Sequence, residues 1–312
     1  MAVVLITGGT GLIGKNLTRH LNRNGHSVII LSRNPQQIST NPLITYAAWN
    51  INEQKIDGSA ITNADYIITL AGAGVMDKYW SKKYKKEIIE SRTKSNQLII
   101  KGLKENENKI KAVIAASAIG WYGDDADQST IKEKGFIESD EADENFLGKT
   151  CKLWEESIEP VTELNKRLVK LRIGIVLSND GGALPEFKRS LNFGIAGIFG
   201  SGKQVVSWIH IDDLCRMFMY AIENERLTGT YNAVSILPVS NKKLMLKLGQ
   251  SLRGSFFIPV HVPKFLLKLI LGERSIELLK STTVNNEKIK AAGFTFIYPT
   301  VDTAFKALKE KV

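Results

Sequence analysis

The chain has 312 residues, of which 43% are hydrophobic and 24% are charged, and its formal net charge is +10. This composition supports a full hydrophobic core, whereas no apolar run approaches the roughly 20 residues that a membrane-spanning helix needs. We therefore predict a globular protein without a transmembrane helix, built as one large domain or as two unequal ones.

The first residues enter a strand pattern directly, without the basic region, apolar stretch and small-residue cleavage site of a leader peptide. We therefore expect the protein in the cytoplasm. Apolar runs, most of them without polar alternation, predict buried parallel strands at 3–7, 28–31, 66–70, 112–116 and 169–177. Helical patterns lie between most of these runs, and this order predicts an α/β fold with a Rossmann-type, doubly wound parallel sheet.

A glycine-rich turn at residues 8–14 joins the first predicted strand to a helical pattern. Glycines allow the chain to turn sharply, let a pyrophosphate approach the backbone and let the helix pack closely on the strand, while the first helix amides face the anion. A strand, this turn and a helix in succession predict dinucleotide binding. The predicted contacts come from Gly8, Thr10, Gly11, Leu12, Ile13 and Gly14.

The end of the second predicted strand indicates which dinucleotide is bound. NAD sites place a carboxylate on the ribose about 20 residues after the glycines, but no Asp or Glu precedes Glu53 in this chain. Arg33 instead offers a guanidinium group suited to a 2′-phosphate, and Ser32 can add a hydroxyl. We therefore predict NADP(H) as the cofactor; the alternative is that Arg33 is an ordinary surface arginine.

The positive charge is densest where five lysines follow the third predicted apolar run. These are Lys78, Lys82, Lys83, Lys85 and Lys86. A solvated helix face explains them, because the stretch lacks the interleaved aromatic platforms of single-strand binders. We predict neither a nucleic-acid nor a membrane partner, and we expect the net charge to attract phosphate-bearing small molecules.

The order of the motifs resembles the extended short-chain dehydrogenase/reductase superfamily. The resemblance rests on the glycine turn and on residues 70–73, 117–123 and 208–214. The chain is similar, more narrowly, to an atypical, epimerase-like branch related to NAD-dependent epimerases and dehydratases, through residues 87–92, 154–155, 291–294 and 298–300. The resemblance implies a cofactor held across the carboxyl ends of the strands. It also implies further cofactor contacts from Leu70, Ala71, Gly72, Glu87, Arg92, Ser117 and Ile175.

A glycine-rich segment from 181 to 202 suggests a domain boundary. We predict an NADP-binding Rossmann domain over residues 1–178, with a return segment at about 207–234. Residues 179–206 and 235–312 are then expected to form a smaller C-terminal α/β domain, which the resemblance implies closes a cleft over a small-molecule substrate. The substrate is unknown, and a homodimer is left open.

The usual catalytic pair of the superfamily is missing. Its reductases and epimerases use a tyrosine as acid/base with a lysine four residues later, whose charge lowers the pKa of the phenol. Alignment on Glu155 puts Leu147 and Cys151 in the two positions, and neither side chain can do that work. Tyr79 and Lys83 have the right spacing but follow the wrong strand.

Ser117 and Tyr122 are the remaining candidates for catalytic residues. Ser117 retains the serine position of the superfamily, and Tyr122 could donate a proton, although a buried hydroxyl beside the cofactor is an equal alternative. His210 and Asp213 open an amphipathic helix, where we expect capping or core roles instead of catalysis. No metal site is predicted, and Cys151 and Cys215 are expected to be buried thiols.

Two functions from different classes follow. The first is an NADP(H)-dependent oxidoreductase or epimerase-like enzyme with unusual catalytic groups, in which the nicotinamide itself supplies the hydride. The second is a regulatory protein that binds NADP(H) without turnover and senses its occupancy. The apolar segment at 262–271 predicts a helix packed in the smaller domain, whereas exposure of Phe265 or Leu269 would indicate a partner surface.

Overall fold

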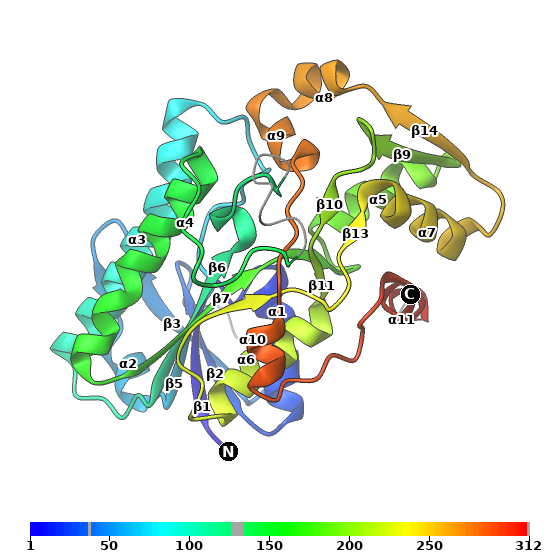
Figure 1. Ribbon diagram of the computed structural model, residues 1–312. Coiled ribbons are helices and arrows are strands. Elements are labelled where there is room, and N and C mark those ends of the chain that lie inside the picture. The colour runs from blue at the N-terminus through cyan, green and yellow to red at the C-terminus, as the bar shows by residue number, and fades with distance from the viewer. Residues whose placement is uncertain (37–38, 126–133, 311–312) are drawn as a thin grey trace.

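The computed structural model describes residues 1–36, 39–125 and 134–310 (Figure 1). Its centre is an eight-stranded sheet with the order β12-β7-β6-β5-β1-β2-β3-β4. All neighbours in it are parallel except β3 and β4. The strands are β1 Val3–Thr7, β2 Ser27–Ser32, β3 Ile44–Asn50, β4 Lys55–Ile56, β5 Tyr66–Thr69, β6 Ala112–Ala118, β7 Arg167–Ile173 and β12 Gly229–Ala233. The predicted Rossmann-type α/β class is confirmed.

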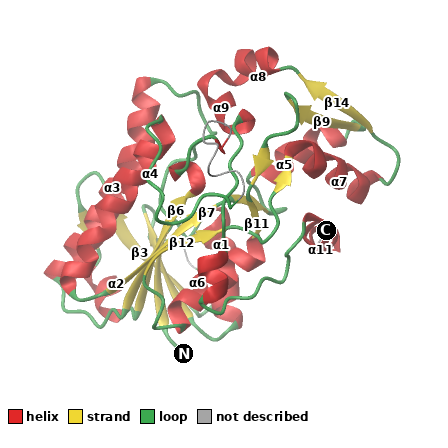
Figure 2. Cartoon of the chain, viewed as in Figure 1, coloured by secondary structure: helices red, strands yellow, loops and turns green. Residues whose placement is uncertain are grey.

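Helices cover both faces of this sheet (Figure 2). On one face, α3 (Lys82–Glu105) packs against α4 (Phe146–Ile158), and on the other α1 (Leu12–Arg23) packs against α6 (Ile211–Glu223). Alternation along β1 explains the two cores: Val4 and Ile6 belong to the buried cluster with α1 and α6, whereas Leu5 belongs to the cluster with α3. A short helix, α2 (Gly58–Asn63), precedes β5.

Two strands differ from the sequence expectation. β3 was not among the predicted runs, because its residues alternate between buried and exposed instead of forming one apolar block. The predicted strand at 169–177 is wrong in one respect, since Gly174 divides it into β7 and β8 (Ile175–Leu177). A Cβ on Gly174 would lie 2.7 Å from the Ser207 carbonyl oxygen. The Gly174 amide still donates to the Ala233 carbonyl of β12, whereas the Ile175 amide donates to the Ser207 carbonyl, so β8 leaves the central sheet and pairs with β11 (Trp208–His210).

A smaller unit follows β8 and has its own buried cluster, which includes Phe187, Ile198, Leu244 and Phe305. Its strands are β9 Ile195–Phe199 and β14 Ile258–Val262, which pair in parallel, and β10 Val205–Val206 and β13 Val239–Ser240, which pair antiparallel. Its helices are α5 Ala183–Leu191, α7 Asn241–Arg253, α8 Lys264–Leu271, α9 Ser275–Leu279 and α11 Val301–Glu310. α10 (Glu287–Ala291) packs on β12.

The return of β12 to the central sheet and the separate buried cluster agree with the predicted two-part organisation, whose boundaries stay a prediction. Three 3-10 turns complete the described elements: η1 Ile119–Trp121, η3 Glu159–Leu164 and η4 Gly272–Arg274. Within the described ranges, no helix has the length and apolarity that crossing a bilayer requires.

Candidate cofactor-binding site

The glycine turn between β1 and α1 is shaped by contacts that exclude side chains. Gly8 has a φ of +69°, which glycine adopts without strain, and its carbonyl accepts a hydrogen bond of 3.0 Å from the Gly11 amide. A Cβ on Gly9 would meet the Ile30 side chain at 2.8 Å, and one on Gly14 would meet the Gly8 oxygen at 2.4 Å. The protein itself therefore requires glycine at these three positions.

Gly11 differs from its neighbours in the turn. A Cβ there would meet only the Gly8 oxygen, at 3.3 Å, and the residue is exposed. It is also the N-cap of α1, where it offers no side-chain acceptor to the first amides of the helix. Thr10 is exposed beside it, and Leu12 and Ile13 are half-buried. The open side of the turn thus combines free space with a helix N-terminus, which fits a pyrophosphate.

Leu12 connects the turn to the glycine-rich segment after β8. A Cβ on Gly182 would lie 3.0 Å from Leu12 Cδ2, and one on Gly181 would lie 3.6 Å from Leu12 Cδ1. Two glycine segments far apart in the sequence therefore meet at the first residue of α1.

Ser32 and Arg33 lie where β2 ends and help to line a pocket of about 640 Å³. Arg33 is exposed, whereas the Ser32 hydroxyl is held by an amide hydrogen bond of 3.1 Å from Asn34. Lys55 is a second cation in the lining. Asp57, an acid in the same lining, caps α2 by accepting hydrogen bonds from the amide and hydroxyl of Ser59. Lys55 also forms an ion pair of 3.1 Å with Glu53, so Arg33 is the group in this lining that is best placed to meet an anion.

The segment after β5 is held in place by its backbone. The Thr7 hydroxyl accepts hydrogen bonds from the amides of Leu70 and Ala71 at 3.0 and 3.1 Å. A Cβ on Gly8 would lie 2.9 Å from the Leu70 carbonyl carbon. Leu70 and Ala71, predicted as cofactor contacts, therefore lie directly beside the glycine turn.

Arg92 supports the same segment from α3. Its guanidinium donates hydrogen bonds to the carbonyl oxygens of Ala73 at 3.0 Å and Ile88 at 2.9 Å, and it lies over the Trp154 ring. A Cβ on Gly72 would lie 3.0 Å from the guanidinium carbon. The structure brings Arg92 and Gly72 together, and Arg92 acts there as a buried support for the loop.

Glu87 and Ile175 lie farther out. The Glu87 carboxylate is exposed and pairs at 3.6 Å with Lys78, a residue outside the glycine turn. Ile175 opens β8 and is 38% exposed. An exposed isoleucine at this position is compatible with the expected nicotinamide contact and differs from a simple core residue.

Ser117, at the carboxyl end of β6, belongs to a buried polar network. Its hydroxyl donates a hydrogen bond of 2.7 Å to Glu155, whose carboxylate also binds Arg172 through contacts of 2.8 and 3.1 Å. Burial opposes the charge of Arg172, but the hydrogen bonds that Arg172 donates to Glu155 favour it, and the pKa of Arg172 is raised. Sequence reasoning missed this pair, although two opposite charges in apolar elements are expected to meet.

Tyr122 occupies the other end of this network. Its hydroxyl donates to Asn232 at 2.7 Å and accepts from Arg172 at 3.0 Å, and its ring stacks on Phe136. The residue is fully buried, and burial raises the pKa of the hydroxyl to about 12 from its ordinary value of 10.0. Both predicted catalytic hydroxyls are thus engaged inside the protein, and their catalytic role stays a prediction.

The position of the usual tyrosine and lysine is filled by apolar packing. Leu147 and Cys151 of α4 are buried against Gly120, where an added Cβ would approach both side chains within 3.5 Å. Burial raises the pKa of the Cys151 thiol to about 12. At neutral pH this thiol is therefore protonated, and neither side chain can exchange a proton with a substrate.

The predicted structural roles of His210 and Asp213 are confirmed. His210 caps α6 by accepting a hydrogen bond of 3.1 Å from the Asp212 amide. The Asp213 carboxylate accepts hydrogen bonds from the amides of Ile297 and Tyr298. Asp213 therefore fastens the C-terminal segment to α6.

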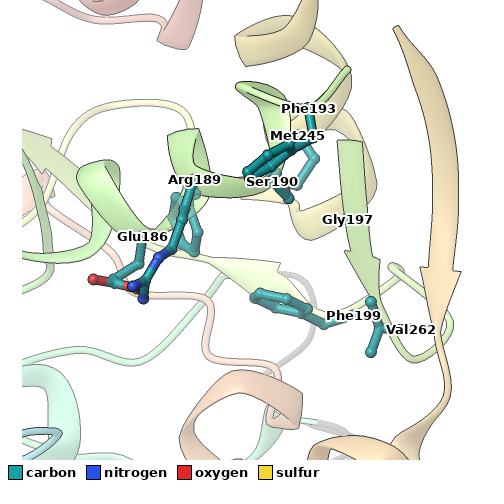
Figure 3. A pocket seen from close by; sticks show the side chains of 9 residues that line it. Glu186, Arg189, Ser190, Phe193, Gly197, Phe199, Met245 and Val262 are labelled. Carbon is teal, nitrogen blue, oxygen red and sulfur yellow. Dashed lines mark hydrogen bonds and ion pairs between the residues drawn. The ribbon is translucent and has the colours of Figure 1, made fainter. Parts of the chain in front are cut away.

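A separate hollow of about 380 Å³ lies in the smaller unit (Figure 3). Its lining includes Phe187, Phe193, Phe199, Met245 and Val262, with Glu186 and Arg189 at one side. None of the residues that were predicted for the cofactor or for catalysis lines it.

Comparisons with known proteins agree with this geometry. Residues 4–143 match the family model described as the NAD dependent epimerase/dehydratase family, and residues 262–308 match a domain of unknown function, DUF1731. An epimerase family protein of Bacillus subtilis is 33% identical over 98% of this chain and 97% of its own length. One of Staphylococcus saprophyticus is 34% identical over 97% of this chain and 98% of its own.

Solved structures extend the likeness to the whole fold. A human epimerase family protein, crystallised with NADPH, has a TM-score of 0.84 at 26% identity and covers 99% of this chain and 100% of its own. A nucleoside-diphosphate sugar epimerase of Corynebacterium glutamicum has a TM-score of 0.73 at 28% identity, covering 97% of this chain and 57% of its own. MoeE5, solved with UDP-glucuronic acid and NAD, shares the fold at 18% identity, with a TM-score of 0.75 over 99% of both chains.

Proposed function

Because the chain belongs to the epimerase family, related to NAD-dependent epimerases and dehydratases, we propose that it binds NADP(H) across the carboxyl ends of its central strands. The observation that carries this proposal is the difference between the glycines of the turn. Protein contacts require glycine at 8, 9 and 14, whereas the space above Gly11 and the first amides of α1 is open to a pyrophosphate.

The preference for NADP(H) over NAD(H) rests on Arg33. Its exposed guanidinium lies at the end of β2 and lines the pocket there. A 2′-phosphate would meet Arg33 there, with Lys55 as a second cation in the same lining. The NADPH found in the human relative supports the proposal, while the NAD in MoeE5 shows that the fold alone does not decide it.

Titration with NADPH and NADH tests the choice of cofactor. We expect the parent protein to bind NADPH more tightly, and Arg33→Ala to weaken NADPH binding by roughly tenfold to a hundredfold, the value of a charge-assisted hydrogen bond. NADH binding should change little. Arg226→Ala, which removes an exposed arginine after α6, is the matched control. Equal affinities of the parent for both cofactors would overturn the 2′-phosphate proposal.

We propose further that the protein is an NADP(H)-dependent oxidoreductase or epimerase-like enzyme that acts on a small molecule in the cytoplasm. Bound NADP(H) would supply or accept the hydride. The chain's part is to hold the cofactor at the turn, to support the segment 70–73 through Arg92, and to place Ile175 at the expected nicotinamide side. Ser117 and Tyr122 are the proposed assisting groups, and they would have to act from within their buried network.

A screen of carbonyl compounds and nucleotide sugars tests the reaction, with NADPH absorbance and product epimers as readouts. We expect turnover in at least one class of substrate. Ser117→Ala and Tyr122→Phe should lower that turnover if these hydroxyls assist the reaction. Unchanged turnover in both variants would rule out these two residues and leave an enzyme that works by positioning alone.

One observation favours the second function, a regulatory protein that binds NADP(H) without turnover. Leu147 and Cys151 fill the place of the usual acid/base pair, and both are buried. In this case NADPH would bind tightly while the substrate screen stays silent, and it would slow amide hydrogen exchange in the smaller unit, residues 179–206 and 235–310. Tight binding without either turnover or altered exchange would contradict both functions.

A further inference from the structure

α8 presents large apolar side chains to the surface instead of burying them. Phe265 is 71% exposed, Leu269 is 77% exposed and Ile270 is 53% exposed. Of the residues of α8, all of which the structure describes, only Leu267 is buried. Phe265 and Leu269 are four residues apart, so they lie on one side of the helix. Exposure of these two side chains is the expected sign of a partner surface.

The exposed helix lies beside the lysine-rich start of α3. The Tyr79 hydroxyl donates a hydrogen bond of 2.7 Å to the Ile270 carbonyl, and Arg274 donates one of 2.7 Å to the Met76 carbonyl. Lys85 of α3 also pairs with Glu273. Figure 1 shows α8 and the first turns of α3 at the same end of the molecule. We call residues 76–87 and 264–274 together the basic apolar end.

This end carries a large share of the protein's charge. It contains eight basic and three acidic side chains, a net charge of +5 against +10 for the whole chain. Lys82, Lys83, Lys264 and Lys268 are all exposed. In α8, Lys264 and Lys268 are again four residues apart and lie next to the side that holds Phe265 and Leu269.

Apolar side chains that protrude beside flexible lysines fit the surface of an anionic lipid bilayer. Phenylalanine and leucine enter the boundary between headgroups and acyl chains, while lysine stems bend so that their ammonium groups reach the phosphates. A second copy of this chain is a poor occupant, because two ends of charge +5 would repel each other. A helix of a partner protein would need a groove on this chain, whereas Phe265 and Leu269 stand out from its surface.

We propose that the basic apolar end docks the protein reversibly on membranes rich in anionic phospholipids. The inference is independent of the proposed cofactor site. It revises the expectation of no membrane partner, which rested on the absence of an apolar span and on the interpretation of the five lysines as a solvated helix face. A helix that lies on a membrane needs no such span. With only eight residues in α8, binding depends on the lysines as much as on the apolar side chains.

Sedimentation with lipid vesicles tests the proposal. The full-length protein is mixed with phosphatidylcholine vesicles that contain about one-third phosphatidylserine, and with vesicles of phosphatidylcholine alone. We expect binding only to the anionic vesicles, and weaker binding at high salt. Lys82→Glu with Lys83→Glu, and separately Phe265→Ser with Leu269→Ser, should each lower the bound fraction by about tenfold or more, since each lysine near such a surface contributes about fivefold.

Matched controls separate this surface from general stickiness. Lys104→Glu with Lys111→Glu changes the net charge equally but lies at the other end of α3 and beyond. Phe193→Ser with Phe256→Ser removes two rings that are each 83% exposed, at the opposite ends of β9 and β14 from α8. Both controls should bind as the parent does, with unchanged circular dichroism throughout. The proposal would be overturned if the parent did not bind anionic vesicles, or if the controls lost binding equally. It would also be overturned if no vesicle binding occurred and the α8 substitutions instead converted a dimer to a monomer.

Discussion

At the scale of single residues, Glu155 determines how much freedom the predicted catalytic groups have. Its carboxylate binds both Ser117 and Arg172, and Arg172 in turn binds the Tyr122 hydroxyl. All four side chains are buried, so each hydrogen bond that is removed leaves a partner without water to replace it. A structural role and a catalytic role for these hydroxyls therefore differ in measurable ways.

Tyr122→Phe is expected to destabilise the protein by about 1–3 kcal/mol, because Asn232 and Arg172 each lose a buried hydrogen-bond partner. Urea unfolding measures this loss. Tyr79→Phe is the control, since its hydroxyl is exposed and its removal should cost less than about 1 kcal/mol. If the Tyr122→Phe protein kept the parental stability but lost turnover, the result would contradict a structural role for the hydroxyl and indicate a catalytic one.

The Cys151 thiol is expected to make the free energy of unfolding fall as the pH rises through the alkaline range. Burial raises the pKa of the folded thiol from 9.0 to about 12, so the unfolded chain loses its proton first as the pH rises. The buried, protonated thiol therefore contributes its full stabilisation of the folded protein below pH 9. This contribution is lost between pH 9 and 12 and amounts to a value on the order of 4 kcal/mol, at about 1.4 kcal/mol per pKa unit.

Urea unfolding from about pH 8 to about pH 11 should show this decline, and Cys151→Ala should show a shallower one despite its lower stability at about pH 8. The raised pKa of Tyr122 adds a similar decline above pH 10 in both proteins. Parallel declines in the parent and in Cys151→Ala would contradict the buried, protonated thiol.

Single residues differed in how well the sequence predicted them. Cofactor roles could be predicted for Gly11 and Arg33 because the turn and the end of β2 are local features whose residue types carry the chemistry, and these roles stay predictions. The partners of Ser117 and Tyr122 were not, because Glu155 lies 38 residues from Ser117 and Asn232 lies 110 residues from Tyr122. No local pattern reports such distant pairs.

At the scale of elements, the turn between β1 and α1 combines two different demands. Gly8, Gly9 and Gly14 are needed for packing, whereas Gly11 leaves open the side on which we propose that the pyrophosphate binds. Stability and cofactor binding should therefore respond to different substitutions within the same short turn.

Gly14→Ala is expected to destabilise the protein by at least about 2 kcal/mol, because its Cβ would clash with the Gly8 oxygen and the Gly9 Cα, which belong to the backbone. Gly11→Val should keep the unfolding free energy within about 1 kcal/mol, since Gly11 has an extended backbone that any residue adopts. It should nevertheless abolish NADPH binding by filling the open side. Thermal unfolding and NADPH titration of both variants check this, and retained binding in Gly11→Val would mean that the turn has another use.

The sequence predicted the elements well where the apolar run and the strand coincide, as in β1, β5 and β6. It failed at Gly174, because the apolar residues on both sides of this glycine do not show that the strand changes its partner there. The close approach of Ser207 to Gly174 comes from a distant part of the sequence. At this break β8 turns out of the central sheet, and Ile175, for which we propose the nicotinamide contact, is exposed.

At the scale of the whole molecule, two units meet beside the glycine turn. β12 and α6 come from late in the chain yet complete the central sheet and its helical cover, and Leu12 touches the glycine segment that begins the smaller unit. The glycine-rich segment at 181–202 and the family resemblance predicted a second unit. They could not predict that α8 would leave Phe265 and Leu269 exposed, because an amphipathic pattern is the same whether its apolar side meets a core or a partner.

A crystal structure of the protein with NADPH tests the central claim most directly. We expect the pyrophosphate against Gly11 and the first amides of α1, and the 2′-phosphate within hydrogen-bond reach of Arg33. A cofactor bound elsewhere, or a 2′-phosphate in solvent away from Arg33, would contradict the proposed NADP(H) site.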